Sequence, residues 1–198
     1  MKATTSGSIA ALVLTIGLLA CTSTKNTMQP SSNEPGAMMK GSDKKITNAM
    51  SAAPDAVGKD ATVMDWPVKE GGEFAMLKKG TNGWTCLPDY PGSPGNDPMC
   101  MDGMAMQWAG AWTTKKQPHL ATAGLGYMLQ GGSDASNTDP FAEKPAPGQD
   151  WLNAPPHVMI FPAGGKIDTS VYSTNPKSGG PWIMWAGTAY QHLMVPVQ

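Results

Sequence analysis

The stretch PHVMIF, residues 156–161, is a short apolar run with prolines on both sides. Such a run between turn-forming residues is typical of a buried β-strand. Three further runs have the same form, namely LGYML (125–129), WIMW (182–185) and LMVPV (193–197). The connections between the runs are long and irregular, particularly residues 131–153. The sequence therefore predicts a single α+β domain with a mostly antiparallel sheet, few short helices and long irregular loops.

Two helices and a hairpin are expected before these strands. Apolar residues at three- and four-residue spacing predict a short helix from about Lys44 to Pro54 and another from Met101 to Trp112. Glu73 to Leu87 predicts a β-hairpin, because FAMLKK and WTCL flank the turn-forming residues GTNG. All seven tryptophans lie between Trp66 and Trp185. We expect them to form the core, although tryptophans can also stack on sugars or line an apolar groove.

The beginning of the chain has the form of an export signal. Lys2 precedes the apolar run IAALVLTIGLLA (9–20), which is shorter than the roughly 20 residues that span a bilayer. A short apolar run behind a positive charge is typical of a secretory signal peptide. Its end, Leu18 to Cys21, resembles the bacterial lipobox, and this resemblance implies cleavage before Cys21 and lipidation of that cysteine. An ordinary signal peptide followed by a chance cysteine is the alternative.

These patterns divide the chain into three parts and predict its location. Residues 1–20 are the expected signal peptide, and residues 21–43 are the expected flexible tether because they are polar and lack aromatic residues. Residues 44–198 are the expected globular domain. Thr22 rather than an aspartate follows the cysteine. By resemblance to Gram-negative lipoproteins, this implies a lipid-anchored protein of the bacterial cell envelope, at the outer membrane and facing the periplasm.

Charge composition limits the partners. The chain has 14 basic and 15 acidic residues, and every basic residue is a lysine. Arginine is the preferred residue for forked contacts to phosphate and to guanine, and no basic stripe replaces it. We therefore expect no nucleic-acid partner, and expect contact with a membrane through the lipid. Motifs for zinc, P-loop, dinucleotide and HExxH sites are absent from the sequence.

Cys86 and Cys100 are predicted to form a disulfide. Both lie in a segment rich in turn formers, TCLPDYPGSPGNDPMC (85–100), and an exported protein meets an oxidising compartment in which disulfides persist. A thiolate metal ligand or a reactive thiol is the alternative use of these cysteines.

Two His-x-Met triplets are candidate copper ligands. His157 and Met159 form one pair, and His192 and Met194 form the other. Residues two apart on a strand face the same side, so each pair presents an imidazole and a thioether together, and both groups suit Cu(I). The alternative is that the methionines fill the core and each histidine bonds a nearby backbone group.

The segment from Gly131 to Pro140 is a candidate ligand-binding loop, since functional residues gather on loops held by a sheet. Its polar side chains offer oxygen ligands for calcium, or a nucleophile, Ser133 or Ser136, with His157 as the base. The alternative is that they satisfy their own backbone in turns. The candidate ligand-binding residues are Ser133, Asp134, Ser136, Asn137 and Asp139.

Residues 61–197 resemble a family of uncharacterised secreted bacterial proteins, on the segments GTNGWTC (80–86), YMLQGGSDASNTDP (127–140), PHVMIF, PWIMWAG (181–187) and HLMVPV (192–197). The resemblance implies that this range is one unit, but it supplies no mechanism. We expect a non-catalytic domain that binds a small ligand or metal, with copper or calcium as candidate ions. The expected site lies where the polar loop meets His157 and His192. A hydrolase and a structural or partner-binding surface protein are the alternatives.

Overall fold

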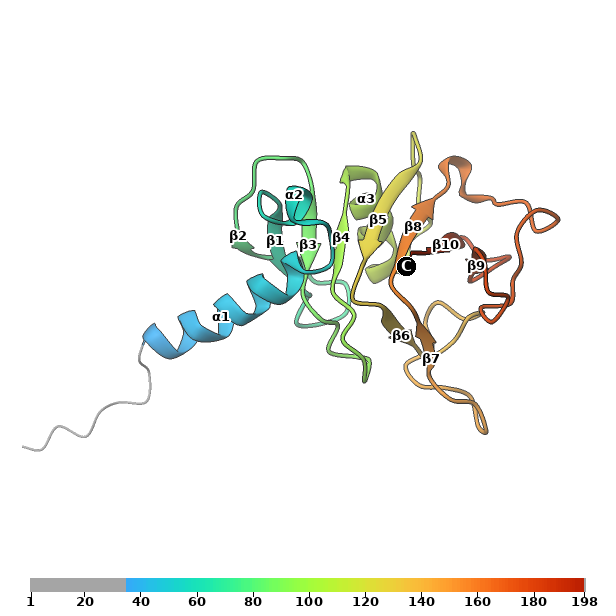
Figure 1. Cartoon of the computed structure of the whole chain (residues 1–198), viewed down its shortest axis with the longest axis horizontal. Helices are drawn as coiled ribbons and strands as arrows, with labels where there is room; N and C mark the ends of the chain where they lie inside the picture. The colour runs from blue at the N-terminus through green and yellow to red at the C-terminus, as the bar shows by residue number, and fades with distance from the viewer. Residues whose placement is uncertain (1–34, 198) are drawn as a thin grey trace, which may run out of the picture. The chain divides into compact units, whose positions relative to one another are not determined.

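A computed structural model describes residues 35–197. Ten strands and three α-helices make up this part of the chain, so the predicted α+β fold is dominated by its sheet. The main sheet has eight strands (Figure 1), in the order β2 (Ala75–Lys78), β1 (Thr62–Asp65), β3 (Thr85–Leu87), β4 (Met99–Met101), β5 (Gly124–Met128), β8 (His157–Phe161), β10 (His192–Pro196) and β9 (Trp182–Met184). A separate antiparallel pair contains β6 (Gly132–Asp134) and β7 (Leu152–Ala154). A 3-10 turn, η1, covers Ala163–Gly165.

The four strands predicted from apolar runs are confirmed to within one residue as β5, β8, β9 and β10. Their mutual pairing is antiparallel throughout. The last of the WIMW residues falls outside β9, because Trp185 has a φ of 53°, which breaks the extended conformation of a strand.

The predicted hairpin from Glu73 to Leu87 is wrong. Its two halves do form β2 and β3, but β1 lies between them, antiparallel to β2 and parallel to β3. The GTNG segment therefore crosses β1 instead of closing a turn. Gly80 lies directly on the backbone before β1, where an added Cβ would come within 2.1 Å of the Thr62 nitrogen. Only a glycine permits this close approach.

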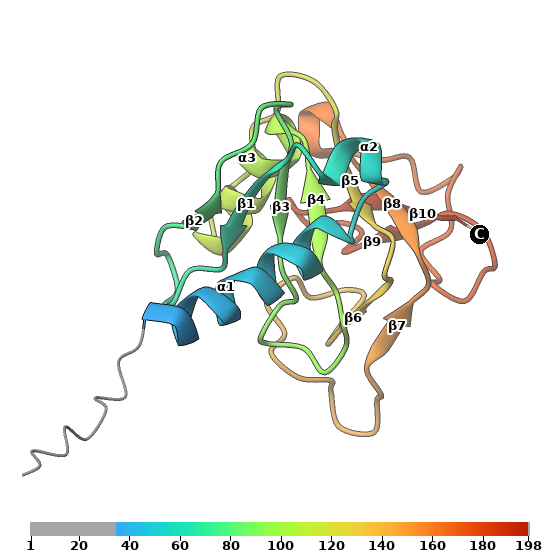
Figure 2. The same cartoon turned by 60° about the vertical axis from the view of Figure 1, so that its left-hand side comes forward.

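Helices lie on opposite faces of the sheet, as Figure 2 shows for α1 (Pro35–Met50) and α3 (Gly103–Thr113). The strands alternate between these two faces. Cys86 and Cys100 face α1, within a small cluster of alanines and Val63. Leu87 and Met101 are the next residues along β3 and β4, and they face α3, within the larger cluster that holds most tryptophans and methionines. The sheet thus separates two cores.

The helix predicted from Met101 begins two positions later. Met101 ends β4, and Asp102 caps α3 by accepting a hydrogen bond from the Ala105 nitrogen at 2.8 Å. An aspartate at this position satisfies a backbone donor that the helix itself leaves free. Ala105 and Trp108 are buried against the sheet as the spacing predicted.

The first helix is longer than predicted. It begins at Pro35 rather than near Lys44, so residues 35–43, which we assigned to the tether, are helical. A short helix α2 (Asp55–Gly58) follows Pro54. The predicted signal peptide, Cys21 and the first part of the tether lie outside the described residues. Among the helices of residues 35–197, none combines the length and the apolar character needed to cross a membrane.

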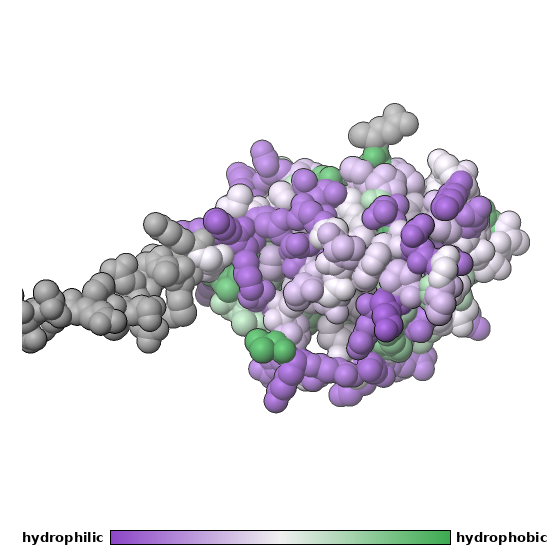
Figure 3. Space-filling model, turned by 90° about the horizontal axis from the view of Figure 1, so that it is seen from below, coloured by the Kyte–Doolittle hydropathy of each residue, from purple (hydrophilic) through white to green (hydrophobic). Residues whose placement is uncertain are grey.

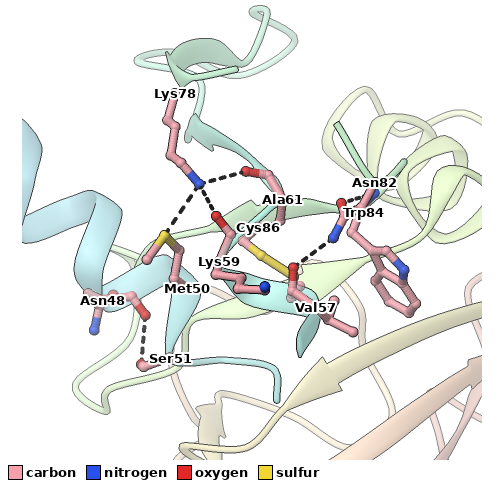
Figure 4. The surroundings of a disulfide bond; sticks show 11 residues. Asn48, Met50, Ser51, Val57, Lys59, Ala61, Lys78, Asn82, Trp84 and Cys86 are labelled. Carbon is pink, nitrogen blue, oxygen red and sulfur yellow. Dashed lines mark hydrogen bonds between the residues drawn. A yellow bond between two sulfur atoms is a disulfide. The ribbon is translucent and has the colours of Figure 1, made fainter. Parts of the chain in front are cut away.

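The predicted disulfide is confirmed. Cys86 and Cys100 stand directly opposite each other on β3 and β4, with an S–S distance of 2.04 Å, and both are fully buried. Figure 4 shows the contacts around the bond. The Lys78 amine donates to the Lys59 carbonyl at 2.6 Å and approaches the Met50 sulfur at 3.6 Å. The disulfide therefore belongs to the face that packs on α1.

Candidate functional site

A cavity of about 620 Å³ lies on the α3 face of the sheet. The strands supply one side, which we call the floor, and α3 and the polar loop supply the walls. Charged residues such as Lys69 and Glu143 also border the cavity. The floor includes Met99, Met128, His157, Met159, His192 and Met194. The walls include Trp66, Trp108, Trp112, Trp185, Asp97, Ser133 and Asp134.

Three of the four wall tryptophans are held through their indole N–H groups, and the buried Trp108 Nε1 has no partner among the described residues. Trp112 donates to the Pro140 carbonyl at 2.8 Å, and Trp185 donates to the Ser136 carbonyl at 2.8 Å. Trp66 donates to the Pro88 carbonyl at 2.7 Å. Each bond joins an aromatic ring of the cavity to a loop around it. The walls are therefore fixed by buried polar contacts as well as by packing.

The polar loop mostly satisfies its own backbone. The Ser136 hydroxyl oxygen accepts from the backbone nitrogens of Thr138 and Asp139, at 3.1 and 3.0 Å. Asp139 in turn accepts from the Phe141 nitrogen at 2.9 Å. Within residues 35–197, no three carboxylate, histidine or cysteine side chains are grouped so as to hold a metal ion. Oxygens of Asp134, Ser136 and Asp139 thus accept hydrogen bonds from backbone nitrogens of the loop itself.

Asn137 and Ser133 anchor this loop to its surroundings. The Asn137 amide donates to the Thr174 carbonyl at 2.9 Å, and its backbone carbonyl accepts from the Trp185 nitrogen at 2.8 Å. The Ser133 hydroxyl accepts from the Gly95 nitrogen at 2.9 Å. The Asn137 side-chain oxygen is buried, and no group of the described residues bonds it.

Two carboxyl groups lie in the cavity wall. Burial raises the pKa of Asp134 to about 7, although its hydrogen bond from the Ser136 nitrogen opposes the shift. Asp97 is 3% exposed, and its pKa is also raised by burial. Asp97 accepts from the Tyr90 nitrogen at 3.0 Å and from the Ser93 hydroxyl. Sequence reasoning missed Asp97, because nothing in its local pattern distinguishes a buried aspartate from a turn residue.

His157 is fully buried in the floor. Its Nδ1 atom lies 2.7 Å from the Pro155 carbonyl oxygen. A carbonyl only accepts, so Nδ1 carries the proton and Nε2 keeps its lone pair. That Nε2 atom is buried and has no hydrogen-bond partner among the described residues. Burial lowers the pKa of the ring, so the imidazole is neutral at pH 7.

His192 lies in an aromatic environment. Its Nδ1 atom is 3.0 Å from the Tyr190 carbonyl oxygen. The ring stacks on Phe161 at 5.2 Å between centroids and meets Trp108 edge-on at 5.1 Å. Burial lowers the pKa of His192 to about 4. This imidazole is therefore also neutral at pH 7.

The structure brings some of the proposed copper ligands together and separates one of them from the others. Met159 stands directly opposite Met194, and His157 stands opposite Pro196. His192 lies four residues before Pro196 on the same strand, or about 13 Å along it. The floor therefore brings His157, Met159 and Met194 together and leaves His192 near its other end. Both histidines still line the same cavity as Ser133 and Asp134, which is the juxtaposition expected from the sequence.

Met128 also lies next to His157, although the sequence analysis did not identify it as a candidate site residue. It is the direct cross-strand partner of His157 in the pairing of β5 with β8. The alternation of GLGYM, with Gly124, Gly126 and Met128 on the buried side, is the only local signal for it. Its partner depends on strand register, which the sequence does not reveal.

Comparison with known proteins gives no match: no family model, no curated protein and no solved structure is significantly similar to this chain. The geometry of the cavity alone therefore supports the functional argument.

Proposed function

We propose that this protein is a non-catalytic binding domain that holds a small, mainly apolar molecule in its cavity. The observation that carries the proposal is the cavity itself. It has the size of a ligand pocket, and its floor and inner wall combine aromatic and methionine side chains with a few polar groups, as ligand pockets usually do. Charged residues, among them Lys69, Lys115 and Glu143, lie at its border.

The polar groups of the cavity fit a ligand that is largely uncharged. Both histidines have a lowered pKa, and burial favours the protonated, neutral form of Asp134. A buried site of this kind disfavours an isolated charge on its ligand. Hydrogen-bonding groups on the ligand would meet Asp134 and Ser133 at the wall.

The hydrolase alternative lacks its first requirement, which is a hydrogen bond between nucleophile and base. The Ser133 hydroxyl accepts from Gly95, and the Ser136 hydroxyl is used within its own turn. Neither nitrogen of His157 bonds a serine. These contacts favour binding over catalysis at this cavity.

We further propose that the domain works in the bacterial cell envelope, tethered to the membrane through a lipid on Cys21. The lipobox-like segment supports this address, and the buried disulfide is consistent with an oxidising compartment. Metabolic labelling with a radioactive or alkyne-tagged fatty acid should label the wild type and leave Cys21→Ser unlabelled. Equal labelling of both would refute the anchor.

Binding can be tested with the uncharged fluorescent probe phenylnaphthylamine, which brightens in apolar surroundings. The wild type should bind one equivalent saturably. Ala154→Trp should block it, because Ala154 lines the cavity and a Trp side chain would fill the space. The matched control is Ala146→Trp, at an exposed position outside the cavity, which should bind as the wild type does. Equal binding by both variants would refute the cavity as the site.

A further inference from the structure

We propose that the floor of the cavity binds a Cu(I) ion between the Nε2 atom of His157 and the thioether sulfurs of Met128 and Met159. The proposal concerns a metal ion, whereas the proposed function concerns an organic ligand. The three metal ligands all belong to β5 and β8. The proposal also revises the copper site expected from the sequence, since His192 is replaced by a residue that strand register brings into place.

The imidazole of His157 is prepared for a metal. Its Nδ1–H donates to the Pro155 carbonyl at 2.7 Å, which leaves the lone pair on Nε2. Histidine ligands of metals are commonly held in this way, with the second ring nitrogen bonded to a carbonyl or carboxylate. The Nε2 atom is buried and has no hydrogen-bond partner within residues 35–197. An unpaired buried acceptor is costly to leave unfilled, so a ligand at Nε2 would remove a defect of the fold.

The sulfurs come from the nearest positions on the same face. Met128 is the direct cross-strand partner of His157, and such partners have Cβ atoms only about 5 Å apart. Met159 lies two residues after His157 on β8, where both residues are buried on the cavity side. The distance between such residues is about 7 Å. The Met159 methyl group lies beside Gly126, so its sulfur would reach Nε2 by a rotation of the methionine side chain. Met194, opposite Met159, is available as a further thioether.

This set of donors selects Cu(I) among biological cations. Neutral imidazole and thioethers are soft ligands that suit Cu(I), whereas calcium and magnesium require oxygen and structural zinc sites mostly use thiolates. Binding forms one Cu–N and two Cu–S bonds. The copper arrives and remains as Cu(I), and no proton leaves because Nε2 carries none. The complex therefore has a single positive charge.

A residue that bears a carboxyl group packs near the end of the Met128 side chain. A Cβ placed on Gly132 would lie 2.8 Å from the Met128 methyl carbon and 3.2 Å from the Asp97 Cβ. Met128 and Asp97 therefore meet at Gly132. A buried cation needs such a partner, and a cavity with only apolar walls would lack it.

One competing arrangement follows from the same observations. The Trp182 Nε1 atom is also buried without a partner in the described part of the chain, and the Trp182 ring centroid lies 6.4 Å from that of His157. A rearrangement that brings Trp182 Nε1 to His157 Nε2 would join the two groups in an indole–imidazole hydrogen bond. Nε2 would then be occupied, and His157 would be a purely structural residue. The copper measurements below distinguish these two arrangements.

The test uses the full chain with Cys21→Ser, so that no free thiol competes beside the disulfide. The protein is titrated anaerobically against the Cu(I)–bicinchoninate complex in ascorbate. It should take up one Cu(I), and His157→Leu should lower the affinity at least about 100-fold, the upper end of what even an outer-shell change costs. Met128→Leu should lower it less, because the imidazole remains. The controls are His119→Leu and Met76→Leu, which change exposed residues outside the cavity and should leave the affinity unchanged.

Equal competition by His157→Leu and its parent would overturn the proposal. A second measurement does not depend on the folding of any variant. Methyl NMR of the parent protein should show Cu(I) moving the ε-methyl signals of Met128 and Met159 but not that of Met76, and unmoved Met128 and Met159 signals would overturn it. Binding of phenylnaphthylamine without binding of Cu(I) would refute the copper site and leave the proposed function standing. Loss of probe binding in Ala146→Trp, or its persistence in Ala154→Trp, bears only on the proposed function.

Discussion

Asp102 and Leu125 exchange two hydrogen bonds. The Asp102 backbone nitrogen donates to the Leu125 carbonyl at 3.0 Å, and the Leu125 nitrogen donates to the Asp102 carboxylate at 2.9 Å. The other carboxylate oxygen accepts from Ala105 and caps α3. One side chain thus fixes the helix that carries Trp108 to the strand that carries Met128. The aromatic wall and the floor of the cavity depend on this junction.

Substitutions at Asp102 should have graded effects on stability. Asp102→Ala removes the cap and leaves the Leu125 nitrogen without this acceptor, so we expect a loss of about 2 kcal/mol or more. Asp102→Asn keeps one acceptor oxygen but presents an NH₂ group to the second donor, and should lie between wild type and alanine. Urea unfolding followed by tryptophan fluorescence measures both. Equal stability of Asn and Ala variants would contradict the two-bond arrangement.

A side chain at Gly126 should force the Met159 methyl group to move. An added Cβ would lie 2.9 Å from the Met159 methyl carbon and 3.3 Å from a ring carbon of Phe161. We expect Gly126→Ala to cost about 1–3 kcal/mol, as overpacking of a core does. Gly110→Ala is the matched control, because Gly110 lies inside α3 with nothing within 4 Å of an added Cβ. That control should gain up to about 1 kcal/mol. Similar effects of both substitutions on thermal unfolding would refute the close approach.

Asp134 should make the fold less stable as the pH rises. Its pKa is about 7 in the folded protein against an ordinary value of 3.8, so the folded state binds the extra proton between these values. Stability therefore falls from about pH 4 to pH 7. Asp134→Asn should raise the unfolding free energy at pH 8 by a few kcal/mol at most, since one pKa unit corresponds to about 1.4 kcal/mol. At pH 3 the two proteins should be equally stable.

The control for this prediction is Asp168→Asn. Hydrogen bonds from Ser170 lower the pKa of the exposed Asp168 carboxyl, so its neutralisation should bring no gain at pH 8. Denaturant unfolding at a series of pH values measures both variants. A pH dependence in Asp134→Asn that equals the wild type would show that Asp134 does not hold the proton.

Loss of the disulfide should weaken the fold without changing the cavity. The bond closes a loop between residues 14 apart, and a loop of about 15 residues corresponds to about 3 kcal/mol. The double variant Cys86→Ala, Cys100→Ala should lose stability of this order in urea. In the absence of denaturant, it should still bind phenylnaphthylamine as the wild type does. Impaired probe binding by a folded variant would contradict the separation of the two faces.

The strands that the sequence revealed are those that carry their own pattern. The apolar runs of β5, β8, β9 and β10 are bounded by turn formers, so their bounds follow from local chemistry. The three-residue strands β4, β6 and β7 are too short for a period to be recognised, whereas the equally short β9 was found by its apolar run. The predicted hairpin was wrong for a different reason. The strand β1 lies between β2 and β3, and no local sequence pattern indicates that β3 has a parallel partner.

The sequence predicted which segments lie near the site, but it did not predict which residues face one another there. Alternation on a strand correctly placed His157 and Met159 on one face. It could not place Met128 opposite His157, because register depends on how whole strands align. The polar loop attracted attention through its composition, yet its hydroxyls and carboxylates serve mainly its own turns. Burial raises the pKa of Asp134, and this residue is buried only when the walls of the cavity have formed around it.

The separation of the two cores has a consequence for how this chain can change over evolutionary time. The face toward α1, with its disulfide, secures the fold with small side chains and a covalent bond. The face toward α3 holds the flexible methionines and the cavity. Substitutions among the cavity methionines of the second face can alter what is bound while leaving the disulfide and its cluster on the first face unchanged. Divergent copies of such a gene can therefore acquire new ligands without first acquiring a new scaffold.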